Sequence, residues 1–432
     1  MPIRTLIDER PLSGLQIGVI GLCFFLNMLD GMDVLAISFA APVIAESWSV
    51  TPQALGIVFS AALAGMTIGA VFISPYTDVI GRRNMILASI SVIAMGMIAT
   101  AYAQSVIQLM LLRLVAGLGI GSMLASLTSM VSEYAPDRHR NLCITILHAG
   151  YPIGAIFAGF VAAWVLPEFG WRPLFILAGV ISLIAVPLVY YMLPESLEFL
   201  VNRQPRNALP NINRILARMT QDPLDSLPEN LEPSAKNSGL KALFSTKLKA
   251  PTLTLWLAFM MSFATLYFLL SWVVKLAVEA GLNIDDAMFA GIALNLGGFF
   301  GSLSLGYLSA KLGLIRVISL FFFIGAAMII AYGNLQGPVT LLLILIFLLM
   351  YFVQGAFTGL YAVAARLYPT EIRTTGVGWA IGAGRVGAIV GPAAAGFILA
   401  TGISISWTFV IFSIPVVIAG MAISKLSYDK VE

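Results

Sequence analysis

Two aspartates lie near the middle of a segment that is otherwise apolar enough to cross a membrane. They occur in the sequence Asp30-Gly31-Met32-Asp33, within the apolar segment 15–45. A carboxylate at the centre of a spanning helix costs about 2.5–3.5 kcal/mol on insertion scales, so acids found there usually line a polar path or pair with another group. A spacing of three residues places both on one helix face. The pair therefore predicts that something polar or charged crosses the membrane here.

Closely spaced carboxylates can carry a proton. Two carboxylates about 6 Å apart repel each other by about 3 kcal/mol at an effective dielectric of 20, and burial disfavours charge further. We therefore expect Asp30 or Asp33 to hold a proton near neutral pH and predict that the pair couples transport to protons. A buried salt bridge, for example with Arg113, is the structural alternative. His148, in the apolar segment 142–166, is a second candidate for proton coupling, or a hydrogen-bond partner between helices.

One arginine lies within another apolar segment, 374–399. Arg385 stands among glycines, where a guanidinium is unfavourable unless it is matched. A guanidinium can hold a carboxylate through two parallel hydrogen bonds. We predict that Arg385 binds the carboxylate of a small organic anion, which enters together with a proton carried by the aspartate pair.

Several polar and aromatic residues in other apolar segments are candidates for the wall of the binding site. Aromatic rings can sandwich a flat ring, and amide or phenol groups can hydrogen-bond to its hydroxyls. Each of these residue types also occurs in ordinary packing. The candidates are Asn27, Tyr267, Phe268, Trp272, Asn295, Tyr351, Gln354 and Tyr361.

The whole chain has the composition of an integral membrane protein. Of its 432 residues, 59% are hydrophobic and only 10% are charged, whereas about 25% of residues in average soluble domains are charged. Twelve segments approach the roughly 20 apolar residues that a spanning helix needs. They are approximately 15–44, 53–74, 84–103, 107–131, 142–166, 172–193, 252–273, 286–310, 314–333, 339–363, 374–399 and 402–424.

Lysine and arginine fall mainly on one side of this arrangement. With twelve spans, both termini and the even-numbered connections share one face, and the opposite face holds only Arg172 and Lys275. Cytoplasmic loops carry the excess of positive charge. We therefore expect a multipass protein of a bacterial inner membrane, with both termini in the cytoplasm.

The spans divide into two similar halves. A long polar stretch, 194–250, separates an N-terminal half, 1–193, from a C-terminal half, 251–432, and short surface helices are expected around 205–219. Gly69 and Gly301 are 232 residues apart, and Pro136 and Pro369, each after a span, are 233 apart. A shared offset between halves of equal orientation predicts a parallel repeat, an arrangement found in transporters whose halves rock.

The connection between the second and third spans carries a charged motif. Asp78 is followed by Gly81-Arg82-Arg83, which resembles the loop signature of the major facilitator superfamily; a short positively charged loop is the simpler interpretation. Glu133, at the end of the fourth span, is a candidate partner for either arginine when a cytoplasmic gate closes, or a solvated helix end. In the second half, Ala310 replaces the aspartate and Leu314-Ile315 the arginines.

The fourth span matches a second superfamily pattern, in which an arginine is followed by alternating glycines. Arg113 precedes Gly117, Gly119 and Gly121. Gly117 and Gly121 are a pair of small residues suited to close helix packing. Arg113 is expected to be an internal partner for an acid, although it can also extend to the membrane surface.

The first and eleventh spans point to one family. The chain resembles the aromatic acid:proton symporter family over nearly its whole length. The more specific parts of the resemblance are Asp30-Gly31-Met32-Asp33 and Gly384-Arg385. The resemblance implies an all-α major facilitator fold with twelve transmembrane helices in two six-helix halves. It also implies import of a benzoate, hydroxybenzoate or hydroxycinnamate type of carboxylate with a proton, by alternating access.

Other functions remain open at this stage. An aliphatic carboxylate, a muconate-like diacid or a sugar acid would suit Arg385 equally well, and a drug exporter would need no such group. A multipass enzyme is disfavoured because His139 and His148, the only histidines, form no evident cluster with other catalytic residues. We expect no metal, no cofactor other than the proton gradient, no nucleic-acid partner, and a functional monomer in the lipid bilayer.

Overall fold

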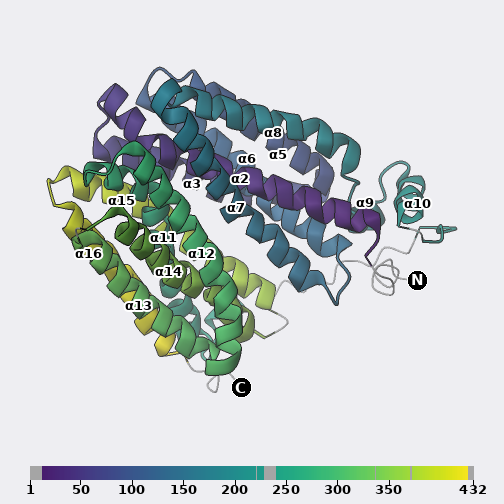
Figure 1. The fold of residues 1–432 in the computed structure, drawn as a ribbon. Coiled ribbons are helices and arrows are strands. Elements are labelled where there is room, and N and C mark those ends of the chain that lie inside the picture. The colour runs from purple at the N-terminus through teal and green to yellow at the C-terminus, as the bar shows by residue number, and fades with distance from the viewer. Residues whose placement is uncertain (1–11, 220, 228–239, 336, 370–371, 427–432) are drawn as a thin grey trace. The chain divides into compact units, whose positions relative to one another are not determined.

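The computed structural model describes residues 12–219, 221–227, 240–335, 337–369 and 372–426, and these residues form helices joined by short loops (Figure 1). Within the described residues, twelve helical segments are long and apolar enough to cross a membrane, which confirms the predicted all-α membrane fold. They are α2 (Gly14–Trp48), the segment that begins with α3 (Pro52–Ile80), α5 (Arg82–Ala101), α6 (Val106–Tyr134), α7 (Arg140–Phe169), α8 (Arg172–Met192), α11 (Lys249–Glu279), α12 (Ile284–Leu312), α13 (Leu314–Asn334), α14 (Val339–Leu367), α15 (Arg373–Ala400) and α16 (Ile405–Ser424).

The second span changes its winding before it ends. Helix α3 (Pro52–Ile68) continues into a π-helical turn, η1 (Gly69–Ile73), a 3-10 turn, η2 (Ser74–Tyr76), and the short α4 (Thr77–Ile80). Regular α-helix ends at Ile68. Pro75 has no N–H to donate and its ring crowds the preceding turn, which disfavours a return to regular α-helix before Thr77. A Cβ at Gly69 would lie 2.2 Å from the Leu118 carbonyl oxygen, so this glycine permits the close approach of α6.

The internal repeat is visible in the helix boundaries. Pro52 and Ile284 begin corresponding spans 232 residues apart, and Tyr134 and Leu367 end corresponding spans 233 residues apart. The turn before the next helix also repeats, because Gly81 and Gly313 precede α5 and α13 with φ values of 98° and 90°. Such φ values favour glycine. The fold thus repeats both the spans and the backbone of one connecting turn.

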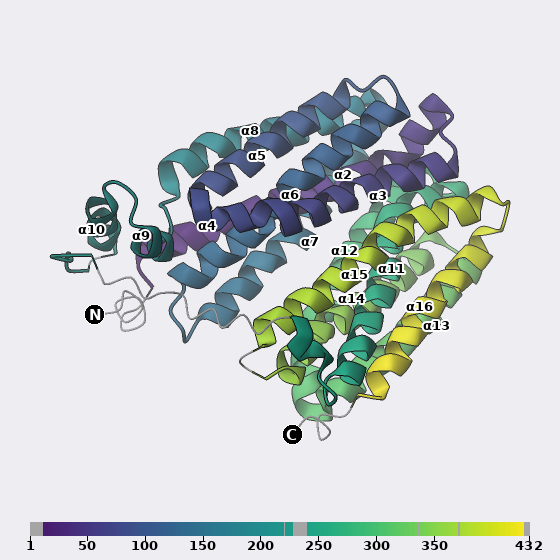
Figure 2. The same cartoon turned by 180° about the vertical axis from the view of Figure 1, so that it is seen from behind.

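The helices form two compact units. Of the described residues, the first comprises 12–34, 64–154, 175–219 and 221–227, and the second comprises 35–63, 155–174, 240–335, 337–369 and 372–426. In the second unit α11 packs against α15, α12 against α14, and α13 against α14 and α16, as both views show (Figures 1 and 2). In the first unit α5 packs against α6. The polar stretch between the halves contains α9 (Leu197–Arg203), α10 (Ala208–Arg218) and the turn η3 (Leu240–Phe244), whereas residues 220 and 228–239 and both chain ends lie outside the described residues.

The second unit includes residues 35–63, which contain the end of α2 and the start of α3. These two segments pack closely on α11 and α15. The Ser38 hydroxyl donates to the Leu270 carbonyl over 2.7 Å, and the Ser60 hydroxyl donates to the Ile389 carbonyl over 2.6 Å. A Cβ at Gly56 would lie 2.7 Å from the Pro392 carbonyl oxygen. These contacts join segments from the two sequence halves through backbone carbonyls, so they need near-contact between helix backbones.

Candidate functional site

The predicted proton-coupling aspartates are buried in the first unit. Asp30 and Asp33 on α2 are 2% and 1% exposed. Asp33 Oδ2 lies 3.4 Å from the Ser182 hydroxyl of α8, a long hydrogen-bond contact. Within the described residues, Asp33 Oδ1 and both carboxylate oxygens of Asp30 have no hydrogen-bond partner. Burying an ionised carboxylate without partners is strongly unfavourable, so the environment of Asp30 favours its neutral form.

Gly31 between these aspartates sits where two helices nearly touch. A Cβ at Gly31 would lie 2.0 Å from the Tyr151 carbonyl oxygen of α7, and a Cβ at Gly154 would lie 1.7 Å from the Met28 carbonyl oxygen. No real Cβ occupies such positions, so α2 and α7 can pack this closely only through glycine. Gly31 thus allows the close contact with α7 that holds the segment from Asp30 to Asp33 in position.

Arg113 lies inside the first unit rather than at its surface. It is 2% exposed, and its Nη2 donates to the Thr100 hydroxyl over 2.7 Å. The guanidinium carbon also lies 5.1 Å from the centre of the Phe175 ring. Arg113 and Asp33 interact electrostatically, yet among the described residues no Asp33–Arg113 pair approaches within 4.0 Å as a direct salt bridge. The structure thus offers Asp33 a nearby positive charge without a direct ion pair.

Asn27 of α2 contacts the α7 backbone beside His148. The buried Asn27 amide donates to the Leu147 carbonyl over 2.7 Å, whereas its own carbonyl oxygen has no hydrogen-bond partner within the part of the chain described. His148, the next residue on α7, is exposed on this unit. Asn27 therefore adds a polar group to α2 about one turn before Asp30. The predicted roles of Asn27 and His148 in substrate binding and proton coupling stay predictions.

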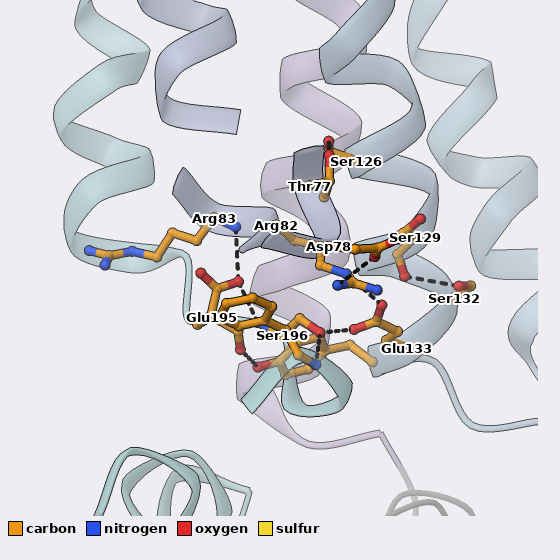
Figure 3. A network of polar contacts seen from close by, with 12 residues as sticks. Thr77, Asp78, Arg82, Arg83, Ser126, Ser129, Ser132, Glu133, Glu195 and Ser196 are labelled. Atoms are coloured by element: carbon orange, nitrogen blue, oxygen red, sulfur yellow. Dashed lines mark hydrogen bonds and ion pairs between the residues drawn. The ribbon is translucent and has the colours of Figure 1, made fainter. Parts of the chain in front are cut away.

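The charged loop motif forms a polar network at one end of the first unit (Figure 3). Arg82 Nε lies 3.0 Å from Glu133 Oε1, and Arg82 Nη1 lies 3.0 Å from Asp78 Oδ1. The Ser196 hydroxyl donates to the second oxygen of Glu133. Arg82 is therefore the partner of Glu133, while Arg83 turns away and lies over the Tyr190 ring, 5.1 Å from its centre.

Glu195 holds the start of α5 in this network. Its Oε1 accepts hydrogen bonds from the backbone N–H groups of Arg83 and Ser196, over 3.0 and 2.9 Å. Burial raises the pKa of the Glu195 carboxyl, and these backbone hydrogen bonds oppose that shift. A Cβ at Gly81 would lie 2.2 Å from Glu195 Oε2, so the glycine makes room for the carboxylate. Sequence reasoning named Arg82 and Glu133 but missed the roles of Glu195 and Ser196, whose only signal was their place at the end of the sixth span.

In the second unit, Arg385 lies against a cluster of aromatic rings. Its guanidinium carbon is 5.9 Å from the centre of the Phe263 ring on α11, and it interacts electrostatically with Tyr361 of α14. Arg385 Nη1 is buried and has no hydrogen-bond partner in the described part of the chain. The side chain as a whole is half-buried. A cation with an unused donor beside aromatic faces suits a ligand that combines a carboxylate with a flat ring.

The rings around Arg385 form a connected cluster that we call the aromatic cluster. Phe263 stacks on Tyr267 with ring centres 5.8 Å apart and planes 10° apart, and meets Phe357 edge-on at 4.6 Å. Tyr361 meets Phe259 and Phe357 edge-on at 5.4 and 5.5 Å. Of these five rings, only the two tyrosines were predicted. The three phenylalanines were missed because, in an apolar helix, a phenylalanine of a binding site looks the same in the sequence as one that only packs in the core.

The other predicted wall residues lie in different surroundings. Trp272 is 1% exposed, and its Nε1 donates to the Pro392 carbonyl over 3.0 Å. Tyr351 contacts Phe321, Phe347 and Phe352 on α13 and α14. The Asn295 amide donates within α12 to Gly291, and the Gln354 side chain would contact a Cβ at Gly298. The structure gives none of these four a described contact with the aromatic cluster.

Comparison with known proteins decides the family. The sequence matches the model of the Major Facilitator Superfamily over residues 23–340 and 296–431. The chain belongs to the major facilitator superfamily. Within it, the chain belongs with the aromatic acid:proton symporter family. It is 32% identical over 427 residues to a gallate transporter of Pseudomonas putida, a match that covers 98% of this chain and 94% of that protein.

A second relative supports the same placement, and a solved structure shows the same fold. The chain is 33% identical over 414 residues to the 4-hydroxybenzoate transporter PcaK of Pseudomonas aeruginosa, covering 95% of this chain and 91% of that protein. A crystal structure of a bacterial homologue of the human lysosomal transporter Spinster, in an inward-facing and unoccupied conformation, matches with a TM-score of 0.75. That match covers 97% of this chain and 98% of that one at 17% identity, so it shows the fold alone. The protein is a multipass membrane transporter and not an enzyme.

The major facilitator signature is unequal between the repeats of this chain. The first copy carries Asp78, Arg82 and Arg83, and two of these hold the network of Figure 3. The second copy keeps the glycine turn at Gly313 but has Ala310 and Leu314-Ile315 in place of the charged residues. The repeat thus preserves the backbone geometry of the turn, while the ion-pairing residues belong to the first copy.

Proposed function

We propose that this transporter imports a small aromatic carboxylate of the benzoate or hydroxybenzoate type together with a proton. The observation that carries the proposal is the position of Arg385, whose buried Nη1 has no partner among the described residues and whose guanidinium adjoins the aromatic cluster. The charge suits a carboxylate, and the rings suit a flat aromatic body. The relatives include transporters of gallate, 4-hydroxybenzoate and benzoate, which supports the same substrate class.

Proton coupling is assigned to the aspartate pair of α2. Asp30 is buried without hydrogen-bond partners in the described residues, so it is well suited to take up and release a proton. Asp33 has a hydroxyl and a nearby arginine to stabilise its charge. We assign the transferable proton to Asp30, with Asp33 as the residue held by Ser182 and influenced by Arg113.

Transport proceeds by alternating access in this proposal. The contacts of Ser38 and Ser60 with backbone carbonyls hold the loop-side ends of α2 and α3 against α11 and α15. These contacts must separate before a ligand can pass on that side. We place the network of Arg82 and Glu133 on the cytoplasmic side, because most lysines and arginines lie in the connections on that face. The side of Ser38 and Ser60 then faces the outside of the cell. The membrane is a bacterial inner membrane in this account, and the functional unit is a monomer.

Uptake by purified protein in proteoliposomes tests the substrate class. Labelled 4-hydroxybenzoate should enter, with competition by benzoate and little competition by benzamide, a neutral molecule of similar shape. Arg385→Lys should weaken benzoate binding, because an ammonium cannot form two parallel bonds. Arg385→Ala should remove the preference for benzoate over benzamide. Failure of wild-type protein to transport any aromatic carboxylate would refute the substrate class, and an unchanged benzoate preference in Arg385→Ala would remove Arg385 from this role.

A further inference from the structure

We propose that Gly384 is a positioning residue that seats the Phe263 ring and thereby sets the preference for aromatic over saturated carboxylates. This inference rests on the proposed function, because it concerns how the same site reads the ring of its substrate. A Cβ at Gly384 would lie 2.4 Å from Phe263 Cδ2 and 2.6 Å from Phe263 Cε2. The ring of Phe263 therefore occupies the space that any larger residue at 384 would fill.

Phe263 is the buried centre of the aromatic cluster. The ring is 3% exposed, whereas Tyr361 is 36% exposed and Tyr267 is half-buried. Phe263 contacts Tyr267 face to face and adjoins the Arg385 guanidinium. Through Phe357 it is also connected to Tyr361. The buried Phe263 ring therefore helps to determine where the more exposed side chains of Tyr267 and Arg385 lie.

The geometry leaves little room for displacement. An ordinary contact with a Cβ is 3.4–4 Å, so an alanine at 384 would require the ring to retreat by at least about 1 Å from its present 2.4 Å contact. The Arg385 guanidinium is already 5.9 Å from the ring centre, near the limit of about 6 Å for an attraction between a cation and an aromatic face. Tyr267 stacks on the same ring and must follow it. Displacement of Phe263 thus disturbs both the cation and a ring of the substrate site.

Neighbouring glycines of α15 provide matched controls. A Cβ at Gly382 would have nothing within 4 Å, whereas a Cβ at Gly387 would lie 1.9 Å from the Met260 carbonyl oxygen. Alanine at 382 therefore tests the effect of the substitution alone. Alanine at 387 tests the effect of forcing α11 and α15 apart. Of these three substitutions, the one at 384 is the one that acts mainly on an aromatic ring.

The test compares benzoate with cyclohexanecarboxylate as competitors of labelled 4-hydroxybenzoate uptake in proteoliposomes. The two acids share a carboxylate and a six-membered ring, but only benzoate is flat. In Gly384→Ala, the affinity for benzoate should fall on the order of tenfold relative to that for cyclohexanecarboxylate, as expected for loss of one aromatic contact. Gly382→Ala should leave the ratio unchanged. Gly387→Ala should lower the melting temperature and the amount of folded protein.

A second variant keeps the inference testable if Gly384→Ala does not fold. Phe263→Leu retains an apolar side chain without a flat ring, and it should lower the aromatic preference in the same direction. Folded Gly384→Ala with an unchanged ratio would overturn the inference, as would an unchanged ratio in Phe263→Leu. Either result would leave the proposed function standing as long as wild-type protein takes up aromatic acids. Absence of such uptake would instead refute the proposed function, and this inference with it.

Discussion

The Ser182 hydroxyl of α8 lies 3.4 Å from Oδ2 of Asp33 on α2. This contact distinguishes the two aspartates of the first span, because Asp30 has no comparable hydrogen-bond partner among the described residues. One acid is thus held in place and the other is not. This difference separates two residues that look equivalent in the sequence, and it is the basis for the separate roles that we propose for them.

Asp30→Asn is predicted to uncouple transport from protons. The substitution removes a buried group that can ionise and leaves a neutral side chain of nearly the same size, so the protein should fold with normal or higher abundance. Accumulation of 4-hydroxybenzoate driven by a pH gradient should be lost, whereas exchange of labelled for unlabelled substrate should continue. Ser182→Ala is the control, with a cost of about 1 kcal/mol or less and retained accumulation. Full accumulation by Asp30→Asn would remove Asp30 from the proton role.

Arg82→Lys is predicted to destabilise the network of Figure 3. Arg82 uses different nitrogens for Glu133 and Asp78, and a lysine ammonium cannot reproduce this planar fork. Because Glu133 is buried, weakening its partner should lower stability by about 1–3 kcal/mol. Asp78 is 68% exposed, so Asp78→Asn should change stability by less than about 1 kcal/mol. Thermal unfolding of both variants in detergent measures the difference, and equal losses would contradict this account.

Glu195 is predicted to make stability depend on pH. Burial raises its pKa in the folded protein. A carboxyl with a raised folded pKa contributes its full stability below its ordinary pKa of about 4.3 and loses that contribution as the pH rises through the folded value. Glu195→Gln keeps an oxygen that can accept the two backbone hydrogen bonds but cannot ionise. The melting temperature of wild type should therefore fall relative to Glu195→Gln as the pH rises across this window.

The companion variant Glu195→Ala separates charge from hydrogen bonding. It removes the acceptor for the N–H groups of Arg83 and Ser196, and loss of a hydrogen bond of this kind costs about 0.5–1.5 kcal/mol. The variant should be less stable than Glu195→Gln at every pH. A difference between wild type and Glu195→Gln that does not vary with pH would show that Glu195 does not titrate in this window.

Gly31→Ala is predicted to disrupt the packing of α2 on α7. The new Cβ would lie 2.0 Å from the Tyr151 carbonyl oxygen, and the backbone of α7 cannot move aside as a side chain can. Overpacking of this kind costs about 1–3 kcal/mol or more, so little folded protein should reach the membrane. Gly21→Ala on the same helix has nothing within 4 Å and should have no harmful effect. Equal abundance of the two variants would contradict the close packing.

Much of the fold could be predicted from the sequence, because the length of an apolar run and a glycine at a turn each determine the structure of the segment that contains them. The twelve spans, the repeat and the Arg82–Glu133 pair follow from apolar runs, a shared offset and opposite charges near two helix ends. Tertiary detail was less accessible. The hydrogen bonds of Glu195 depend on a loop conformation that has no periodic signal. The pairing of Gly384 with Phe263 depends on how α11 and α15 pack, and neither residue type reveals its partner.

The most direct test of the central claim is the external pH during substrate uptake by proteoliposomes. Vesicles containing wild-type protein, in weak buffer without an imposed gradient, receive benzoate or 4-hydroxybenzoate while a pH electrode records the medium. We predict alkalinisation of the medium that accompanies uptake, persists in Ser182→Ala and is absent in Asp30→Asn. Uptake of the aromatic acid by wild-type protein with no change in external pH would contradict proton-coupled transport.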